Sequence, residues 1–270
     1  MNVTFIGGGN MASALTGGLI RQGWPASAIK VVEIAAAARE QLEAKHGVTT
    51  YGALVAEAVS AECIVLAVKP QHMREVARDL RACLESQLVV TIAAGIRISD
   101  LGRWLGDYPR IVRAMPNTPA LVGAGVSALY APSTVSAEER AQAERILRAA
   151  GATLWLERED QLDAITAVSG SGPAYVFYFV EALERAAREL GLSAESARLL
   201  ALETFSGAVK LASLSGESPA VLRERVTSKG GTTERALESL ESGRVKEAIV
   251  RAVKAAAARS RELGDELGKD

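Results

Sequence analysis

The chain has 270 residues, of which 49% are hydrophobic, and its formal net charge at pH 7 is −1. This length can form one large core or two smaller ones, and two domains are the better expectation. The near-neutral charge, with no clustered basic face, argues against a nucleic-acid partner, and the lack of a basic leader or a long apolar run argues against export and membrane insertion. We therefore expect a cytoplasmic protein with small-molecule partners.

Short apolar segments alternate with helical periodicity in the first part of the chain. Residues 2–6 predict a strand that runs into a glycine turn and then a helix. This alternation predicts a parallel sheet with helices on both faces. The further predicted strands are residues 29–34, 63–68, 88–93, 110–114, 125–130 and 153–157, with a helix over 136–150 between the last two.

Strand signals stop after residue 160, and the rest of the sequence predicts helices only. Caps are expected at Ser193, Ser218 and Thr232. The segments 174–187 and 199–214 are more apolar than a single buried stripe requires. This surplus favours a dimer, and the alternative is a helix buried within the monomer.

The glycine turn after the first strand carries a nucleotide-binding pattern. In Gly7-x-Gly9-x-x-Ala12, the first glycine makes the turn, the second admits a pyrophosphate, and the alanine allows close packing of helix and strand. Glu33, at the end of the next strand, is expected to bind the adenosine ribose and to repel a 2′-phosphate, which favours NADH. No arginine follows it directly, although Arg39 could approach; the alternative is that Glu33 is simply solvated.

These patterns define the predicted fold class and domains. The fold is α/β: an N-terminal Rossmann-like doubly wound parallel sheet followed by an all-α C-terminal dimerisation domain. We place a dinucleotide-binding domain at residues 1–158 and a helical dimerisation and substrate domain at residues 159–270.

Three more segments follow predicted strands, at the edge of a parallel sheet where ligands bind. Small residues at 67–71 and 93–95 leave room for the nicotinamide end of a cofactor. Lys69 could contact a phosphate or ribose, or be solvated. Asn117, in the rigid double-proline loop of residues 113–119, could donate to the nicotinamide amide or close a turn.

The stretch 226–237 contains a candidate anion site at a helix start. Gly230 and Gly231 permit a tight turn, Thr232 or Thr233 could cap the helix, and the free amides of the first turn could bind a carboxylate or phosphate. The alternative is an ordinary capped helix.

Other reactive residue types give weaker signals. His46 and His72 are not paired with further ligands at metal spacing, so we predict no metal site. Cys63 and Cys83 are too few for a disulfide framework. Residues 169–173, Ser-Gly-Ser-Gly-Pro, superficially match a nucleophile elbow but lack a base partner, and they are better interpreted as a flexible entry to a helix.

Six blocks occur in order along the chain: residues 5–11 (FIGGGNM), 67–70 (AVKP), 93–95 (AAG), 113–119 (RAMPNTP), 168–175 (VSGSGPAY) and 228–233 (SKGGTT). Taken together, they resemble the pyrroline-5-carboxylate reductase family over nearly the whole chain. The resemblance implies reduction of 1-pyrroline-5-carboxylate to L-proline, the last step of proline synthesis, with NADPH or NADH as cofactor. It also implies an interlocked homodimer, often assembled into a ring of dimers.

The resemblance also implies roles for individual residues. Ser228 and the amides of Gly231 and Thr232 would hold the substrate carboxylate, with Gly230 in the same substrate-binding loop and the Thr233 hydroxyl near the ring nitrogen as the catalytic group. Glu159 would lie beside the substrate, and the site would face the nicotinamide of the partner chain. The implied cofactor-binding residues are Ile6, Gly7, Gly8, Gly9, Asn10, Met11, Glu33, Ala67, Val68, Lys69, Pro70, Ala93, Ala94, Gly95 and Asn117.

Two departures from the family pattern leave questions open. Lys229 stands where the family very often has proline, and it adds a positive charge near the carboxylate site. Residues 51–54 lack the asparagine that many members offer to the ribose, and Glu33 is less suited to NADPH, so the cofactor preference stays open. The rival functions are a hydroxyacid or prephenate-type dehydrogenase, which usually needs a lysine or histidine, and a binding protein without chemistry.

Overall fold

The computed structural model describes residues 1–269, and the packing of the chain divides it into two compact units. The first, called the sheet unit, comprises Met1–Ser171 and residues from Ala256 onward. The second, the helical unit, comprises Gly172–Ala255. The domain boundary expected after residue 158 stays a prediction, while residues 159–171 pack with the sheet.

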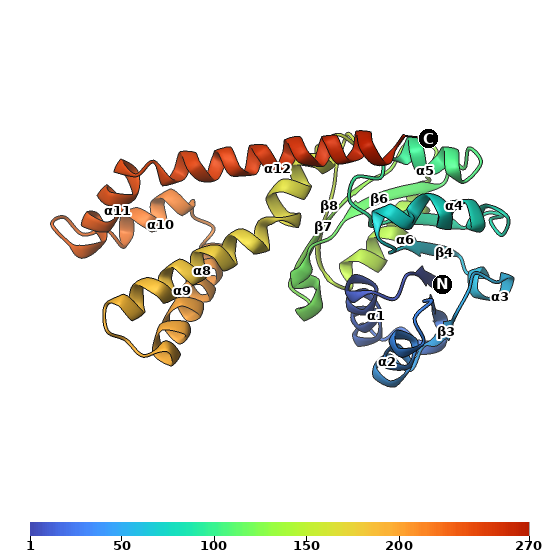
Figure 1. The fold of residues 1–270 in the computed structure, drawn as a ribbon, viewed down its shortest axis with the longest axis horizontal. Helices are drawn as coiled ribbons and strands as arrows, with labels where there is room; N and C mark the ends of the chain where they lie inside the picture. The colour runs from blue at the N-terminus through green and yellow to red at the C-terminus, as the bar shows by residue number, and fades with distance from the viewer. Residues whose placement is uncertain (270) are drawn as a thin grey trace. The chain divides into compact units, whose positions relative to one another are not determined.

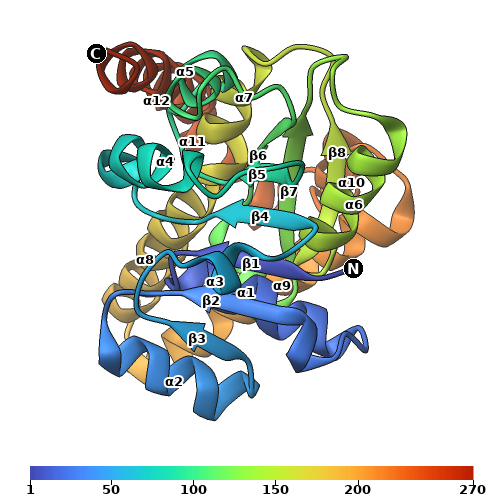
Figure 2. The same ribbon diagram turned by 90° about the vertical axis from the view of Figure 1, so that its right-hand side faces the viewer.

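The sheet unit is built on eight strands in the order β3-β2-β1-β4-β5-β6-β7-β8 (Figure 2). Neighbouring strands are parallel except for β6 and β7. The strands are β1 (Val3–Ile6), β2 (Ile29–Val32), β3 (Thr49–Tyr51), β4 (Cys63–Leu66), β5 (Leu88–Thr91), β6 (Ile111–Met115), β7 (Gly125–Tyr130) and β8 (Gly151–Trp155).

The antiparallel pair β6 and β7 is the exception in the predicted parallel sheet. Only residues 116–124 join these strands, and a parallel crossover needs a dozen or more residues. The chain therefore turns back on itself at this point. Between β7 and β8 lies the predicted helix, α6 (Ala137–Arg148), and that pair of strands is parallel. No strand is predicted at β3, which has three residues and follows α2 (Ala36–His46).

Helices cover both faces of the sheet, as the strand composition requires. All residues of β1, β4 and β5 are buried, so both sides of these strands need an apolar cover. One buried cluster includes Leu15 and Ile146, and another includes Leu80 and Leu101. The helices of this unit are α1 (Asn10–Arg21), α2 (Ala36–His46), α3 (Ala56–Val59), α4 (Met73–Arg81), α5 (Ile98–Trp104), α6 (Ala137–Arg148) and α7 (Gln161–Ile165) (Figure 1). The doubly wound arrangement is confirmed.

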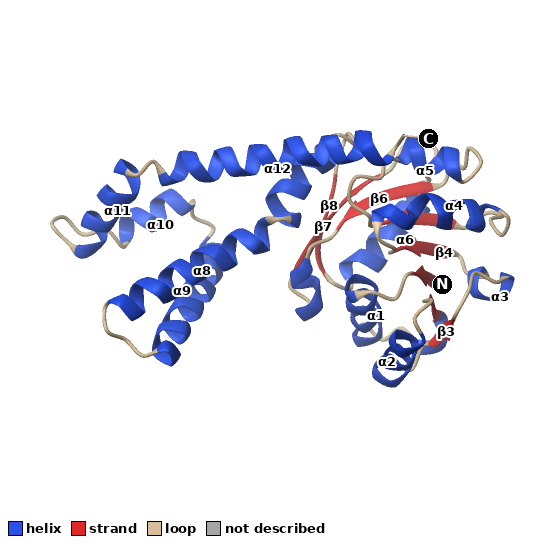
Figure 3. Ribbon diagram, in the orientation of Figure 1, coloured by secondary structure: helices blue, strands red, loops and turns tan. Residues whose placement is uncertain are grey.

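The helical unit contains no strand among its residues, as predicted (Figure 3). Its helices are α8 (Gly172–Glu189), α9 (Ala194–Ser215), α10 (Pro219–Arg225), α11 (Thr232–Ser242) and the first part of α12 (Val245–Leu267), whose end belongs to the sheet unit. No helix within residues 1–269 is both long and apolar enough to cross a membrane.

The predicted caps are correct in two of three places. Ser193 and Ser218 accept hydrogen bonds from the first turns of α9 and α10. Thr232, however, is the first residue of α11, and Gly231 is its N-cap without a side-chain hydrogen bond. The reason is the left-handed conformation of Gly230 (φ +74), which turns the chain before Gly231.

Candidate functional site

The glycine turn joins β1 to α1 with backbone geometry that requires glycine. Gly7 has φ +98, and a Cβ there would lie 2.8 Å from the backbone of Ala67. A Cβ at Gly9, the N-cap of α1, would meet no atom within 4 Å. The start of α1 therefore lies open beside a compact turn, which suits an anion held by backbone amides.

Glu33 lies beside this turn. Its Oε2 accepts a hydrogen bond from the Gly8 amide at 2.8 Å, and its Oε1 accepts one from the Ala35 amide at 2.9 Å. These bonds fix the carboxylate at the position where dinucleotide-binding folds hold the ribose. Arg39 is close to the same segment, because its Nη1 donates to the carbonyl oxygens of Glu33 and Ile34 at 2.8 and 2.9 Å.

The other predicted cofactor segments lie at the same edge of the sheet. In the strand register, Ile6 pairs with Leu66, and Leu66 with Thr91, so β1, β4 and β5 end together. The segments 67–70 and 93–95 follow directly from these ends. The structure therefore brings the glycine turn and both small-residue segments to one edge, as the sequence predicts for parallel strands.

Asn117 makes the contacts of a residue that closes a loop. It is buried, its Nδ2 donates to the Ser169 carbonyl at 3.1 Å, and its Oδ1 accepts from the Val126 amide at 2.9 Å. The turn-closing alternative therefore describes its contacts in this structure. A bond to a nicotinamide amide stays a prediction.

Glu159 belongs to a polar cluster within the sheet unit that sequence reasoning missed. Its Oε1 accepts from Arg113 Nη1 at 2.9 Å and from the Ile98 amide, at the start of α5, at 2.8 Å. The Arg113 side chain is only 7% exposed. A buried arginine needs a carboxylate partner, so an arginine within a predicted buried strand was the sequence signal that could have indicated this pair. Oε2 of Glu159 has no partner among residues 1–269.

The loop before α11 forms a turn closed by its own backbone. The Gly231 amide donates to the Ser228 carbonyl at 3.0 Å, and the Gly230 amide donates to Oε2 of Glu234 at 2.6 Å. The amides of Thr232 and Thr233 have no hydrogen-bond partner among the described residues. The open donors of this helix start therefore lie one residue later than expected, because the turn already uses the Gly231 amide.

Two residues singled out in the sequence, His46 and Ser169, have structural contacts. His46 ends α2, and its Nε2 lies 3.0 Å from Oγ of Ser13; burial, with Lys45 and Arg21 nearby, lowers its pKa. Ser169 lies in a π-helical turn before α8, and its hydroxyl donates to the Ile165 carbonyl at 3.1 Å. Within residues 1–269, no group of three or more His, Cys, Asp or Glu side chains is placed to hold a metal ion.

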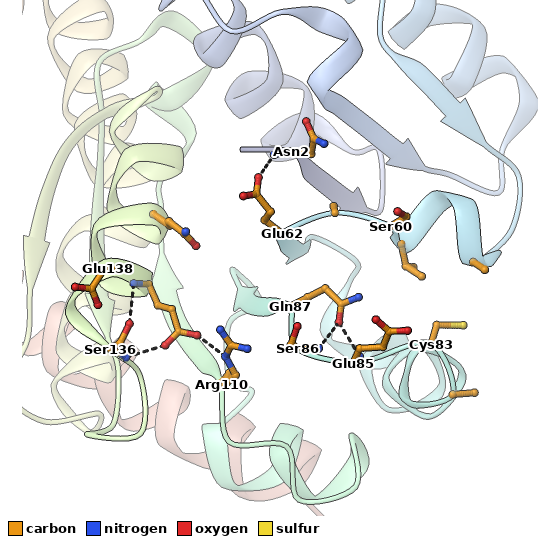
Figure 4. Close-up of a pocket in the computed structure, with 16 residues that line it drawn as sticks. Asn2, Ser60, Glu62, Cys83, Glu85, Ser86, Gln87, Arg110, Ser136 and Glu138 are labelled. Carbon is orange, nitrogen blue, oxygen red and sulfur yellow. Dashed lines mark hydrogen bonds and ion pairs between the residues drawn. The ribbon is translucent and has the colours of Figure 1, made fainter.

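A cavity of about 820 Å³ lies at the opposite edge of the sheet (Figure 4). Its lining includes Asn2, Glu62, Gln87 and Arg110, which precede β1, β4, β5 and β6. Arg110 is paired with Glu139 at 2.5 Å, and Glu62 accepts from the Asn2 amide at 2.6 Å. None of the predicted site residues lines this cavity.

Comparison with known proteins matches both parts of the chain. Residues 159–263 match a family model described as pyrroline-5-carboxylate reductase dimerisation, and residues 2–95 match one described as NADP oxidoreductase, coenzyme F420-dependent. A pyrroline-5-carboxylate reductase of Pseudomonas aeruginosa is 44% identical over 268 residues, covering 99% of this chain and 98% of the relative.

Two solved structures are similar over the same extent. A pyrroline-5-carboxylate reductase from Coxiella burnetii is 43% identical with a TM-score of 0.91, covering 97% of this chain and 98% of the other. The Plasmodium falciparum pyrroline carboxylate reductase, solved with NADP bound, is 30% identical with a TM-score of 0.87, covering 98% of each chain.

Proposed function

Because this chain belongs to the pyrroline-5-carboxylate reductase family, we propose roles for its residues in the reaction of that family. The chain reduces 1-pyrroline-5-carboxylate to L-proline with NAD(P)H, the last step of proline biosynthesis. The observation that carries the assignment of the substrate site is the start of α11, where the Thr232 and Thr233 amides lack partners.

The residues at the carboxyl edge of the sheet fit a nicotinamide dinucleotide. The turn at Gly7 has no room for a Cβ, while the space over Gly9 is open. The α1 amides would hold the pyrophosphate, and Glu33 would hold the ribose. The segments 67–70 and 93–95 would lie along the nicotinamide end, which supplies the hydride. Preference between NADPH and NADH would depend on whether the repulsion of the 2′-phosphate by Glu33 or its attraction to the nearby Arg39 is stronger.

The substrate carboxylate would bind at the start of α11. The Thr232 and Thr233 amides and the Ser228 hydroxyl would donate to it. Gly230 and Gly231 would shape the turn, since their own amides are already bonded to Glu234 and to the Ser228 carbonyl. Lys229 is exposed and would add favourable long-range charge for the anion.

The chain's own groups would act mainly by positioning the substrate for hydride transfer. The Thr233 hydroxyl would orient the ring nitrogen and, with a water molecule, deliver or retain a proton there, because a protonated imine accepts hydride better. We propose that Glu159 lies beside the substrate. Its Oε1 accepts hydrogen bonds from Arg113 and from the Ile98 amide, so Oε2 is the oxygen that would face the substrate.

We propose that the working assembly is a homodimer that can assemble further into a ring of dimers, and that it acts in the cytoplasm. The support is the apolar surface of the helical unit. Phe177, Tyr178, Leu199, Val209 and Leu214 are each at least 60% exposed. Exposed apolar surface of this kind is typical of subunit interfaces.

The direct experiment is turnover of 1-pyrroline-5-carboxylate, followed by loss of reduced-nicotinamide absorbance, with NADH and NADPH in parallel. Absence of turnover with both cofactors would contradict the function. For the site, we expect Thr233→Ala to lose about tenfold or more in kcat/KM, the effect of one transition-state hydrogen bond. Thr233→Ser keeps the hydroxyl and is the matched control, with activity close to wild type. Unchanged kinetics in Thr233→Ala would remove Thr233 from the mechanism.

A further inference from the structure

The end of α12 packs closely on the segment that follows β5 (Figures 1 and 2). Gly95 is buried with φ +75, and a Cβ there would lie 3.1 Å from Cδ1 of Leu267. Gly264 of α12 is buried as well, and a Cβ there would lie 3.2 Å from Nη2 of Arg97. The two chain segments therefore approach each other at glycines, with little space between them.

Three polar contacts reinforce this packing. Arg97 Nη2 forms an ion pair with Asp265 Oδ1 at 2.5 Å, and Arg103 Nη2 donates to the Gly268 carbonyl at 2.8 Å. The Ser260 hydroxyl donates to Oδ1 of Asp163 at 2.7 Å. The last turns of α12 are thus attached to both ends of α5 and to α7.

The segment between β5 and α5 also has a contact that does not involve α12. The amide of Ile98, the first residue of α5, donates to Glu159, which is paired with Arg113 of β6. The segment after β5 therefore contacts the end of α12 through Gly95 and Arg97, and the carboxylate of Glu159 through the Ile98 amide. Gly95 adopts its left-handed conformation without strain, so the contacts on both sides are what restrict this segment.

We propose that residues 260–268, which form the last turns of α12 and the residue after it, position the segment 93–95 for cofactor binding, with Arg97 and Asp265 as positioning residues. The proposal rests on the cofactor assignment of this segment given above. Neither residue needs to touch the cofactor. If the contacts are lost, the segment adopts other conformations, and the apparent affinity falls with the fraction of molecules that remain competent to bind.

The test compares neighbouring ion pairs on α12. Asp265→Asn removes the charge that faces Arg97, and Glu266→Gln, the matched control, removes the exposed pair with Arg259 one residue further on. Cofactor dissociation constants are measured for NADPH and NADH by nicotinamide fluorescence, without substrate. We expect Asp265→Asn and Arg97→Ala to raise the dissociation constant about threefold, since the pair is partly exposed. Removal of residues 264–270 should raise it further, about tenfold.

Further measurements separate positioning from general damage. Asp265→Glu should restore cofactor binding, and Asp265→Asn should leave the substrate KM at saturating cofactor and the melting temperature near wild type. Equal losses in Asp265→Asn and Glu266→Gln, or unchanged cofactor affinity in Asp265→Asn and Arg97→Ala, would overturn the proposal. Ala94→Leu tests the underlying assignment separately, because unchanged cofactor binding in that variant would show that the cofactor does not lie along this segment at all.

Discussion

The sheet unit and the helical unit differ in how they use their apolar residues. In the sheet unit, Phe5, Leu15, Ile64 and Leu66 are among many large side chains with 2% exposure or less. In the helical unit, the buried apolar residues are only Val180, Ala197 and Ala201. The first unit has a complete core of its own, whereas the second has apolar helices without enough neighbours. The sheet unit is therefore expected to be stable as a single copy, and the helical unit to depend on assembly.

The largest expected effect comes from a charge on the apolar helical surface. Phe177 of α8 is 61% exposed, and we expect Phe177→Glu to dissociate the homo-oligomer, because the carboxylate would be desolvated at the interface. The dissociation constant of the homo-oligomer should rise at least about 30-fold, the effect of losing an interface hot spot, and activity should fall with the assembled fraction. Light scattering and turnover measure the two effects. Ile34→Glu, at an 85% exposed position in the sheet unit, is the control and should keep the wild-type mass. An active, assembled Phe177→Glu variant would contradict the assigned interface.

The second prediction concerns the core of the sheet unit. Leu66 in β4 is fully buried, and Leu66→Ala should reduce the free energy of unfolding by about 2–5 kcal/mol through lost burial and a cavity. Denaturant unfolding should give the same loss at low and high protein concentration, because the contacts are within one copy. A loss that varies strongly with protein concentration would show that the sheet unit also depends on assembly for its core.

The sequence predicted those parts of the molecule that local patterns determine. Strand, glycine turn and helix at Gly7, and the acid at Glu33, follow from the spacing of small, apolar and acidic residues. It missed the direction of β7, which depends on the length of a connection, and the pair of Arg113 with Glu159, which are far apart in the chain. It also placed the α11 cap one residue late, because backbone hydrogen bonds in the turn were not visible from residue types.

A third prediction addresses the cofactor edge of the sheet unit. Glu33 is held by the Gly8 and Ala35 amides, so its charge stays near the ribose position. Glu33→Ser should lower the dissociation constant for NADPH relative to NADH by about tenfold, equivalent to ~1.4 kcal/mol, because the repulsion of the 2′-phosphate is removed. Arg39→Ala should shift the ratio in the opposite direction. If neither variant changes the ratio, this edge does not determine cofactor preference.

The smallest predicted effect is the pH dependence of one carboxylate that stabilises the sheet unit. Hydrogen bonds from Trp155, Thr153 and Arg148 lower the pKa of Glu144. Since the folded pKa lies below the ordinary value of about 4.3, the stabilisation is fully present above that pH and is lost as the pH falls through the folded pKa. Glu144→Gln should therefore be less stable than wild type at neutral pH, by less than about 1 kcal/mol.

This difference should shrink as the solution is made acidic, because protonation of Glu144 in the wild type removes the same charge that the glutamine lacks. Urea unfolding of both proteins across the acidic range measures it. Glu241→Gln in the helical unit is the comparison: Lys246 lowers the pKa of Glu241 as well, but this pair is exposed to solvent, so its pH-dependent difference should be smaller. A difference between Glu144→Gln and wild type that is independent of pH would assign the effect of Glu144 to its geometry, with no contribution from its charge.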